Sequence, residues 1–230
     1  MSALVDLLGK TELFGGLDAG ELKACAEKFR EVKFVKGQSL FVRGEKATSL
    51  YLVAQGRVRL AITTEDGGEL SFRHTVVGEI FGEVGVLDGG VRTADATALT
   101  PVVAYRLEQG DFHALWAARP SVTERLVAFL CQRLRETSYQ LESIALHPLH
   151  VRLARFFLVV VGDRTAPAGK RIPVELGMSQ NEVALLLGAS RPKINEALGT
   201  LEKSGAINRT IDRIFCDPAK LGEIARSNNA

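Results

Sequence analysis

The sequence predicts an α+β protein with a β-rich N-terminal region, one long central helix, and a C-terminal helix-turn-helix followed by a β-hairpin. Three patterns carry this prediction. Short runs of alternating apolar residues, separated by turn residues, extend from about residue 29 to 107, which is typical of an antiparallel barrel or sandwich. Residues 121–147 lack Gly and Pro and carry an apolar heptad pattern. Near the C-terminus, two short amphipathic segments flank a glycine turn.

The β-rich region follows a short helix, which we expect over about residues 18–29. Within the region, the residues Val58, Leu60 and Ile62 alternate with Arg57, Arg59 and Ala61, and a period of two continues through Leu70, Phe72, His74 and Val76. Turn residues separate the runs at Lys36-Gly37, Arg43-Gly44, Gln55-Gly56 and Asp66-Gly67-Gly68. We therefore expect several short antiparallel strands.

The long helix is expected over about 121–147, with Pro120 just before it and Pro148 just after it. Six residues are spaced by three and four in turn: Val127, Leu130, Leu134, Thr137, Leu141 and Ile144. Such a seam is typical of a helix that pairs with a copy of itself, which predicts a homodimer; packing against the protein's own barrel is the alternative. A polar residue in a seam costs stability and often serves register or a ligand, which makes Thr137 and the adjacent Ser138 candidate site residues.

The helix-turn-helix begins at Ser179-Gln180-Asn181-Glu182, which predicts a capping box. Gly188 is placed to end that helix, because glycine tolerates the left-handed conformation of a tight turn. Ser190 is placed to cap the second helix, with Arg191 and Pro192 in its first turn.

The second helix has an apolar face and a polar face. Ile194, Ala197, Leu198 and Leu201 are expected to face inward, whereas Arg191, Lys193 and Asn195 point outward near the N-terminus, where a recognition helix contacts bases and phosphates. The segments Ile207-Asn208-Arg209 and Ile214-Phe215-Cys216, joined through Asp212-Arg213, predict a wing hairpin, and Ile172-Pro173-Val174 predicts an edge strand.

A helix-turn-helix is also a general packing unit, so the pattern alone does not establish DNA binding. The polar outward face, the hairpin and the charge favour it: residues 149–230 contain 12 Lys and Arg against 8 Asp and Glu, whereas the rest contains 17 against 19. The candidate DNA contacts are Ser179, Gln180, Ser190, Arg191, Pro192, Lys193, Asn195 and Arg209.

Composition excludes several classes of protein. No stretch of about 18 apolar residues is present, so we expect no membrane span. The first ten residues lack a basic start followed by an apolar run, so we expect no secretory signal. Three scattered cysteines favour a reducing cytoplasm over a disulfide framework or a metal site. The four histidines are scattered and form no nucleophile–base constellation, so we expect no enzyme and no catalytic residue.

The segment from Phe81 to Ala94, FGEVGVLDGGVRTA, carries the most specific chemistry. Gly82 lets a backbone N–H approach an anion closely. The planar guanidinium of Arg92 can donate two parallel hydrogen bonds to a phosphate, and Thr93 adds a hydroxyl and a backbone N–H. The Glu83 carboxylate can accept hydrogen bonds from a sugar hydroxyl. Phosphate and sugar ligands together indicate a nucleotide site; the alternative is a plain glycine-rich loop in which Glu83 and Arg92 form a weak surface ion pair.

On these motifs, the sequence resembles the cyclic-AMP receptor protein/FNR (CRP/FNR) family of bacterial transcription regulators, over about residues 13–221. The resemblance implies an N-terminal cyclic-nucleotide-binding β-roll of the double-stranded β-helix or jelly-roll type, a long dimerisation helix and a C-terminal winged helix-turn-helix. It implies that Gly82, Glu83, Val84, Arg92, Thr93 and Ala94 form the phosphate-binding cassette. The run Arg133 to Ser138 is similar to the family's central helix, where a Thr-Ser pair bonds adenine, one residue from each subunit.

Other members of the family have different ligand-binding motifs. Iron–sulfur sensors need a cysteine cluster, which Cys25 alone does not supply, and haem-binding members have Cys or His in place of the cassette. At the start of the recognition helix, Pro192 and Glu196 depart from the base-reading residues of the family's cyclic-AMP-binding members, and Pro148 replaces a capping Asp at the hinge.

We therefore expect three regions: 1–118, the nucleotide-binding β-roll; 119–148, the dimerisation helix and hinge; and 149–230, the winged helix-turn-helix. The expected function is DNA-binding transcription regulation in the cytoplasm under allosteric control by cyclic AMP, with no metal or other cofactor. The expected partners are a near-palindromic double-stranded operator, a second copy of the chain and RNA polymerase. The alternatives are a regulator of the same fold that needs no ligand or that senses cyclic GMP or a cyclic dinucleotide.

Overall fold

The computed structural model describes residues 2–64, 69–118, 120–162, 164, 170–210 and 213–226. They form two compact units, Met1–Arg135 and Glu136–Ala230, and each is described by itself. The predicted turn at Asp66-Gly67-Gly68 and the wing residue Asp212 lie outside the described residues.

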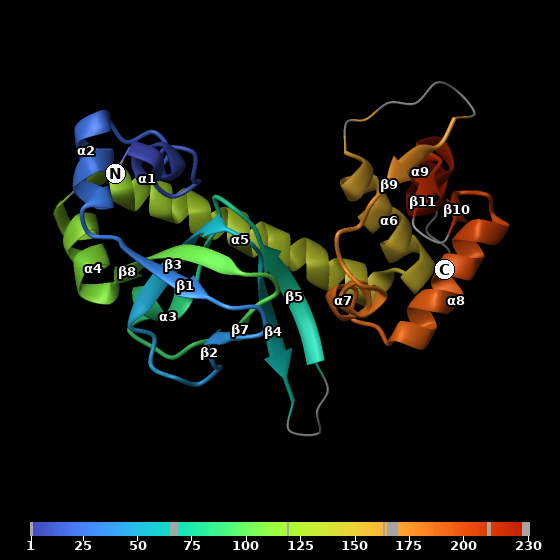
Figure 1. Ribbon diagram of the computed structural model, residues 1–230, viewed down its shortest axis with the longest axis horizontal. Helices are drawn as coiled ribbons and strands as arrows, with labels where there is room; N and C mark the ends of the chain where they lie inside the picture. Colours follow the sequence, from blue (N-terminus) through green and yellow to red (C-terminus); the bar gives the residue numbers. More distant parts are fainter. Residues whose placement is uncertain are drawn as a thin grey trace. The chain divides into compact units, whose positions relative to one another are not determined.

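Strands of the first unit form two antiparallel four-stranded sheets, with the orders β1-β8-β3-β6 and β2-β7-β4-β5 (Figure 1). Their bounds are Arg30–Phe34 (β1), Ser39–Phe41 (β2), Ser49–Gln55 (β3), Val58–Thr63 (β4), Glu69–Thr75 (β5), Ile80–Phe81 (β6), Asp95–Ala98 (β7) and Val102–Glu108 (β8). The predicted β-roll is therefore confirmed, including the turns at Gly37, Gly44 and Gly56, which all have positive φ.

Strand β3 shows why the unit has two apolar layers. Tyr51 and Val53 pack with residues of the other sheet between the two sheets, whereas Leu50 and Leu52 belong to the cluster under the helices. Because successive side chains of a strand point to opposite faces, a strand covered on both faces is apolar throughout.

The register of β4 and β5 differs from the predicted alternation. A bulge between Leu60 and Ala61 interrupts the pairing, and Ala61 is buried instead of facing outward. On β5 the fully buried residues are Ser71 and Thr75, not the apolar members of the predicted pattern. An extra residue in one strand shifts its side chains to the other face, and the sequence does not reveal this.

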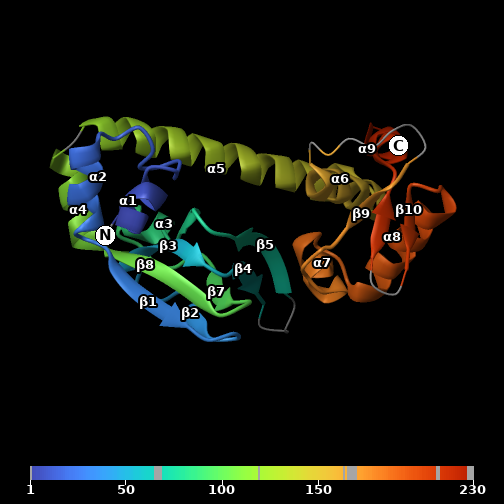
Figure 2. The same ribbon diagram turned by 45° about the horizontal axis from the view of Figure 1, so that its top comes forward.

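Helices cover one face of the roll. Their bounds are Ser2–Leu8 (α1), Ala19–Ala26 (α2), Val84–Asp88 (α3), Gln109–Ala118 (α4) and Pro120–Leu146 (α5). In Figures 1 and 2, α1, α2 and α4 gather beside the first turns of α5. The expected helix over 18–29 is confirmed as α2, which Asp18 begins with a capping box to Glu21.

The long helix α5 is confirmed within one residue of its predicted bounds, and it has two apolar stripes. Val122, Leu126 and Phe129 are buried in the helix-covered core of the first unit. The seam residues Val127, Leu130, Leu134 and Leu141 are instead exposed in the single chain. The alternative that the seam packs against the protein's own barrel is therefore wrong, because a different stripe does so.

The second unit combines helices with a three-stranded antiparallel sheet of order β10-β11-β9. The bounds are Leu149–Val161 (α6), Ile172–Val174 (β9), Gln180–Leu186 (α7), Arg191–Lys203 (α8), Ile207–Arg209 (β10), Ile214–Cys216 (β11) and Pro218–Arg226 (α9). The wing hairpin and the edge strand are thus confirmed. In β9, Pro173 pairs with Phe215 on its inner side, and its carbonyl oxygen accepts a hydrogen bond from Arg164 Nη1 at 3.3 Å.

Candidate functional site

The cassette residues lie in a folded loop between β6 and β7. Gly82 and Glu83 follow β6 directly, α3 follows them, and the returning strand segment lies beside residues 44–47. Arg92 N donates to Glu45 O at 2.8 Å, and Gly44 N donates to Arg92 O at 2.9 Å. These bonds fix the C-terminal part of the cassette against residues 44 and 45.

Gly82 has a φ of +77° and lies against Arg92. A Cβ on Gly82 would lie 2.8 Å from Arg92 Nη1 and 3.2 Å from a ring carbon of Phe41. Both the left-handed conformation and the close approach require a residue without a side chain. This explains why glycine stands there.

Arg92 is a buried cation, with 4% of its surface exposed. Its Nη1 donates to Gly82 O at 2.8 Å and its Nη2 to Ser49 Oγ at 3.5 Å. Its Nε is also buried and has no acceptor among the described residues. Burial lowers the pKa of Arg92, although Tyr51, Glu45 and Glu83 act in the other direction. A buried guanidinium with unused N–H donors is suited to bind an anion.

Glu83 is buried beside this cation, with 8% exposed. Burial raises the pKa of Glu83; its own backbone hydrogen bond and the charges of Arg133, Arg73 and Arg92 oppose the rise. Within the described part of the chain, no ion pair joins Glu83 to Arg92. The alternative of a surface ion pair is therefore wrong, because both groups are buried.

The other predicted ligand residues are placed differently. Val84, the first residue of α3, and Thr93 are exposed, whereas Ala94 is buried. Thr137 and Ser138 are both exposed on α5, in the part of this helix that belongs to the second unit. The structure thus brings Gly82, Glu83 and Arg92 together within the first unit.

Three residues that sequence reasoning did not assign also belong to this environment. The positive charges of Arg73 on β5 and Arg133 on α5 lower the pKa of Glu83 and so oppose the effect of its burial. The guanidinium of Arg92 stacks on Phe41, with Cζ 4.0 Å from the ring centroid. Arg133 lay within the segment that resembles the family, but nothing in the sequence connects it or Arg73 to Glu83. A carboxylate and a cation that both lie in a closed loop can serve a hydroxyl and a phosphate of the same ligand.

The second candidate site is the helix-turn-helix of the second unit. Ser179 caps α7, because its Oγ accepts from Glu182 N at 3.2 Å and its own N donates to Glu182 Oε2 at 2.6 Å. The capping box is therefore confirmed, and Gly188 ends the helix with a φ of +60°. Gln180, the first residue of α7, is half-buried.

Helix α8 presents the predicted faces. Ile194, Ala197, Leu198 and Leu201 are buried, and Arg191, Pro192, Lys193 and Asn195 are exposed. Ser190 occupies the N-cap position and is exposed, but its side chain makes no capping hydrogen bond, so this part of the prediction is wrong.

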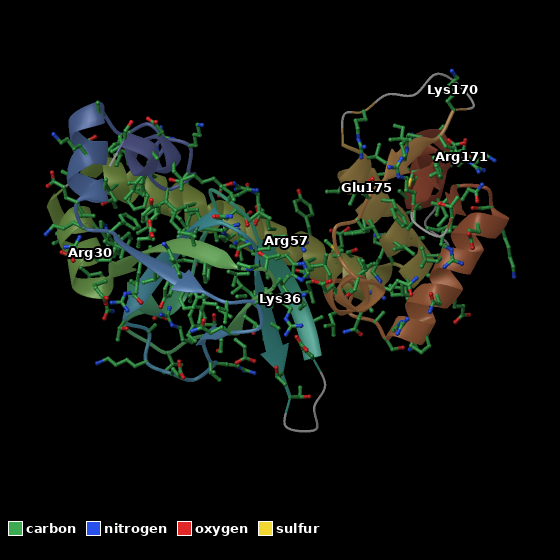
Figure 3. The ribbon with its side chains drawn as sticks, in the orientation of Figure 1. Arg30, Lys36, Arg57, Lys170, Arg171 and Glu175 are labelled. Atoms are coloured by element: carbon green, nitrogen blue, oxygen red, sulfur yellow. The ribbon has the colours of Figure 1, made fainter. Side chains whose placement is uncertain are left out.

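The wing has its own ion pairs. Arg209 hydrogen-bonds Glu202 of α8, which raises the pKa of Arg209 and lowers the pKa of Glu202. Glu175, labelled in Figure 3, pairs with Arg213 at 3.2 Å. Arg209, a predicted DNA contact, therefore already has a carboxylate partner, whereas Lys193 and Arg191 stand at the exposed N-terminus of α8.

Two absences concern only the described residues. No group of three His, Cys, Asp or Glu is placed to hold a metal ion. No helix there combines the length and apolar character needed to cross a membrane.

Comparison with known proteins agrees with these two sites. Residues 31–119 match the model of the cyclic nucleotide-binding domain, and residues 151–224 match the Crp-like helix-turn-helix domain. The first match contains the whole cassette, and the second contains α7, α8 and the wing.

Relatives match over most of their length. The chain is 31% identical to the cyclic AMP receptor protein of Thermus thermophilus, covering 85% of this chain and 87% of the relative. It is 29% identical to the CRP-like cAMP-activated global transcriptional regulator of Mycobacterium tuberculosis, covering 88% and 90%. Among solved structures, the c-di-GMP responsive regulator CLP of Xanthomonas campestris has the same fold, with a TM-score of 0.72 at 20% identity, covering 86% of this chain and 99% of that one.

Proposed function

Because this chain belongs to the CRP/FNR family of DNA-binding transcription regulators with a cyclic nucleotide-binding domain, we propose that cyclic AMP controls its affinity for DNA. The observation that carries the proposal is that a buried cation, Arg92, and a buried carboxylate, Glu83, lie in one loop without forming an ion pair with each other within the described residues. Cyclic AMP has a singly charged phosphate fused to a ribose with one free hydroxyl, so it needs a cation and a hydrogen-bond acceptor close together.

Each part of the ligand has a proposed partner. The cyclic phosphate meets Arg92, Thr93 and the backbone around Gly82, and the ribose 2′-hydroxyl donates to Glu83. Val84 and Ala94 complete the cassette. The adenine meets Thr137 of the same chain and Ser138 of the partner subunit, a proposal supported by the Thr-Ser pair in the helix seam.

Dimerisation through α5 is the second part of the proposal. The exposed seam residues Val127, Leu130, Leu134 and Leu141 follow the heptad spacing of a two-stranded coiled coil. A ligand that touches both helices of a pair has different contacts in different arrangements of the pair. This difference lets it shift a conformational equilibrium.

The proposed output is the exposed face of α8. Arg191, Pro192, Lys193 and Asn195, together with Ser179, Gln180, Ser190 and Arg209, form the proposed DNA contacts. A two-fold dimer is suited to a near-palindromic operator with half-sites about 34–36 Å apart, and phosphate contacts make binding salt-dependent. We place this function in the cytoplasm, with RNA polymerase as the further partner. The proposed division is 1–118 for ligand binding, 119–148 for dimerisation and 149–230 for DNA binding.

Calorimetric titration with cyclic AMP tests the ligand site. The wild type is expected to bind, and Arg92→Gln is expected to lose at least tenfold in affinity, because a charge-assisted bond to phosphate is worth about 1.5–3 kcal/mol. The exposed Arg43 of the same unit provides the control, Arg43→Gln, which should bind as the wild type does. Unchanged affinity in Arg92→Gln would refute the phosphate site.

Selection of DNA from a random pool, with and without cyclic AMP, tests the control of DNA binding. Enrichment of one near-palindromic sequence only with cyclic AMP is the expected result. Equal enrichment without it would indicate a ligand-independent regulator. Repeating the selection with cyclic GMP and with cyclic di-GMP separates cyclic AMP from these alternative ligands.

A further inference from the structure

The aromatic ring of Phe41 lies directly under the guanidinium of Arg92. The Cζ of Arg92 is 4.0 Å from the Phe41 ring centroid, and Phe41 itself is buried. A cation over an aromatic face is attracted by the negative centre of the ring, and the attraction is strongest where water is excluded. Phe41 lies outside the cassette motif, which begins at Phe81.

Gly82 bounds the same space from another side. A Cβ on Gly82 would approach both Arg92 Nη1, at 2.8 Å, and two ring carbons of Phe41, at 3.2 and 3.3 Å. Nη1 also donates to Gly82 O. The guanidinium and the ring edge therefore both abut the backbone of Gly82, the residue proposed to lie against the phosphate.

Phe41 is itself held by an aromatic cluster. Its ring centroid is 6.0 Å from those of both Tyr51 and Phe81, which stack on each other at 5.4 Å. Ser49 Oγ lies 3.4 Å from Tyr51 Oη and 3.5 Å from Arg92 Nη2, which connects the cluster to the guanidinium a second time. A ring packed in this way has little freedom to turn, so its face is a fixed surface.

We infer that Phe41 is a positioning residue of the nucleotide site: its ring fixes the plane of the Arg92 guanidinium so that the unused N–H donors are ready for the ligand phosphate. The inference rests on the proposed function, because it assigns to Phe41 a part in binding that ligand. An arginine side chain that is already ordered loses less conformational entropy when it binds. The ring thus adds to the order that the hydrogen bonds of Arg92 to Gly82 O and Ser49 Oγ already provide.

The expected effect follows from the strength of a desolvated cation–π contact. Removing the ring is expected to weaken binding of cyclic AMP about tenfold. A leucine fills part of the same space with apolar atoms but has no negative ring centre. Phe41→Leu therefore tests the ring face, and Phe41→Tyr, which keeps it, is the conservative rescue.

Phe34→Leu is the matched control. Phe34 is partly buried, packs against the same cluster and meets Tyr51 edge-on at 6.3 Å, so its loss disturbs the cluster from another side. Within the described residues, the guanidinium of Arg92 lies over the rings of Phe41, at 4.0 Å, and of Tyr51, at 5.8 Å, and not over that of Phe34. All four proteins are compared by titration calorimetry with cyclic AMP and by thermal unfolding without ligand.

The expected pattern is a loss of about tenfold in affinity in Phe41→Leu, with affinity within threefold of the wild type in Phe41→Tyr and Phe34→Leu. Equal affinity in Phe41→Leu and wild type overturns the inference. An equal loss in Phe41→Leu and Phe34→Leu, or in Phe41→Leu and Phe41→Tyr, also overturns it, because the ring face is then not what matters. A wild type that binds no cyclic AMP refutes the proposed function as well, which distinguishes the two failures.

Discussion

Arg152, in the first turn of α6, donates a hydrogen bond from Nη1 to the carbonyl oxygen of Leu187, the residue that caps the C-terminus of α7. Helix α6 is thus tied to the turn of the helix-turn-helix. Burial lowers the pKa of Arg152, and its Nε is buried without an acceptor among the described residues. The bond also satisfies a carbonyl at a helix end, where the helix itself offers no donor.

Replacing Arg152 by Met should therefore destabilise the second unit. The lost hydrogen bond involves a charged donor, so a decrease of about 1.5–3 kcal/mol in the free energy of unfolding is expected. Denaturant unfolding of the full chain measures it, with exposed Lys203→Met as the control. A change below about 0.5 kcal/mol, as at an ordinary surface position, would contradict a structural role for the bond.

Glu83→Gln should stabilise the ligand-free protein at neutral pH. Burial raises the pKa of Glu83 in the folded state, so its stabilising contribution is present at low pH and is lost as the pH rises through the raised pKa. Glutamine avoids that loss. The gain in melting temperature over the wild type is expected at pH 7 and should shrink toward pH 4, as followed by circular dichroism.

The same variant should bind cyclic AMP less tightly, because the amide is a weaker acceptor than the carboxylate. Glu124→Gln, at an exposed position of α5, is the control for both measurements. A melting temperature that falls at pH 7 in Glu83→Gln would show that the carboxylate contributes more to folding than its burial costs.

Gly82→Ala and Gly78→Ala form a matched pair. Both glycines have positive φ, +77° and +89°, so each alanine should cost about 1–2 kcal/mol of stability. Only Gly82 has Arg92 and Phe41 within reach of a Cβ; the space around Gly78 is open. Calorimetry should therefore show weakened cyclic AMP binding in Gly82→Ala and nearly normal binding in Gly78→Ala. Equal affinities would mean that the contact with Arg92 is irrelevant to the ligand.

Leu141→Glu should prevent dimerisation. Leu141 lies in the heptad seam of α5 and is 68% exposed in the single chain. A carboxylate placed there would be buried without a partner in a paired seam, which is strongly unfavourable. Sedimentation equilibrium should give a monomer for this variant and a dimer for Tyr139→Glu, which is equally exposed but lies off the seam. A dimer in Leu141→Glu would assign the pairing to another surface.

The sequence predicted elements whose cause is local. The capping box of α7, the Gly188 turn and the length of α5 depend on neighbouring residues, and the structure has them all. The buried stripe of Val122, Leu126 and Phe129 was not predicted. The helix has two apolar repeats, and the sequence does not indicate which of them packs inside the chain.

Features that depend on contacts between residues distant in sequence could not be predicted. The bulge between Leu60 and Ala61 brings Ala61 to the buried face of β4 next to Leu60, and no turn residue marks it. Within the site, Gly82, Glu83 and Arg92 could be predicted because they share one segment. Phe41 and Arg73 could not, because only the paired sheets bring β2 and β5 into the surroundings of that segment.

The edge strand β9 resists the addition of a strand from another molecule. Pro173 has no amide hydrogen, and its carbonyl oxygen is already occupied by Arg164, so this residue offers neither half of a ladder bond to an incoming strand. Sheets with open, regular edges tend to join edge to edge into aggregates. The C-terminal sheet is therefore blocked against such growth at that position of its β9 edge.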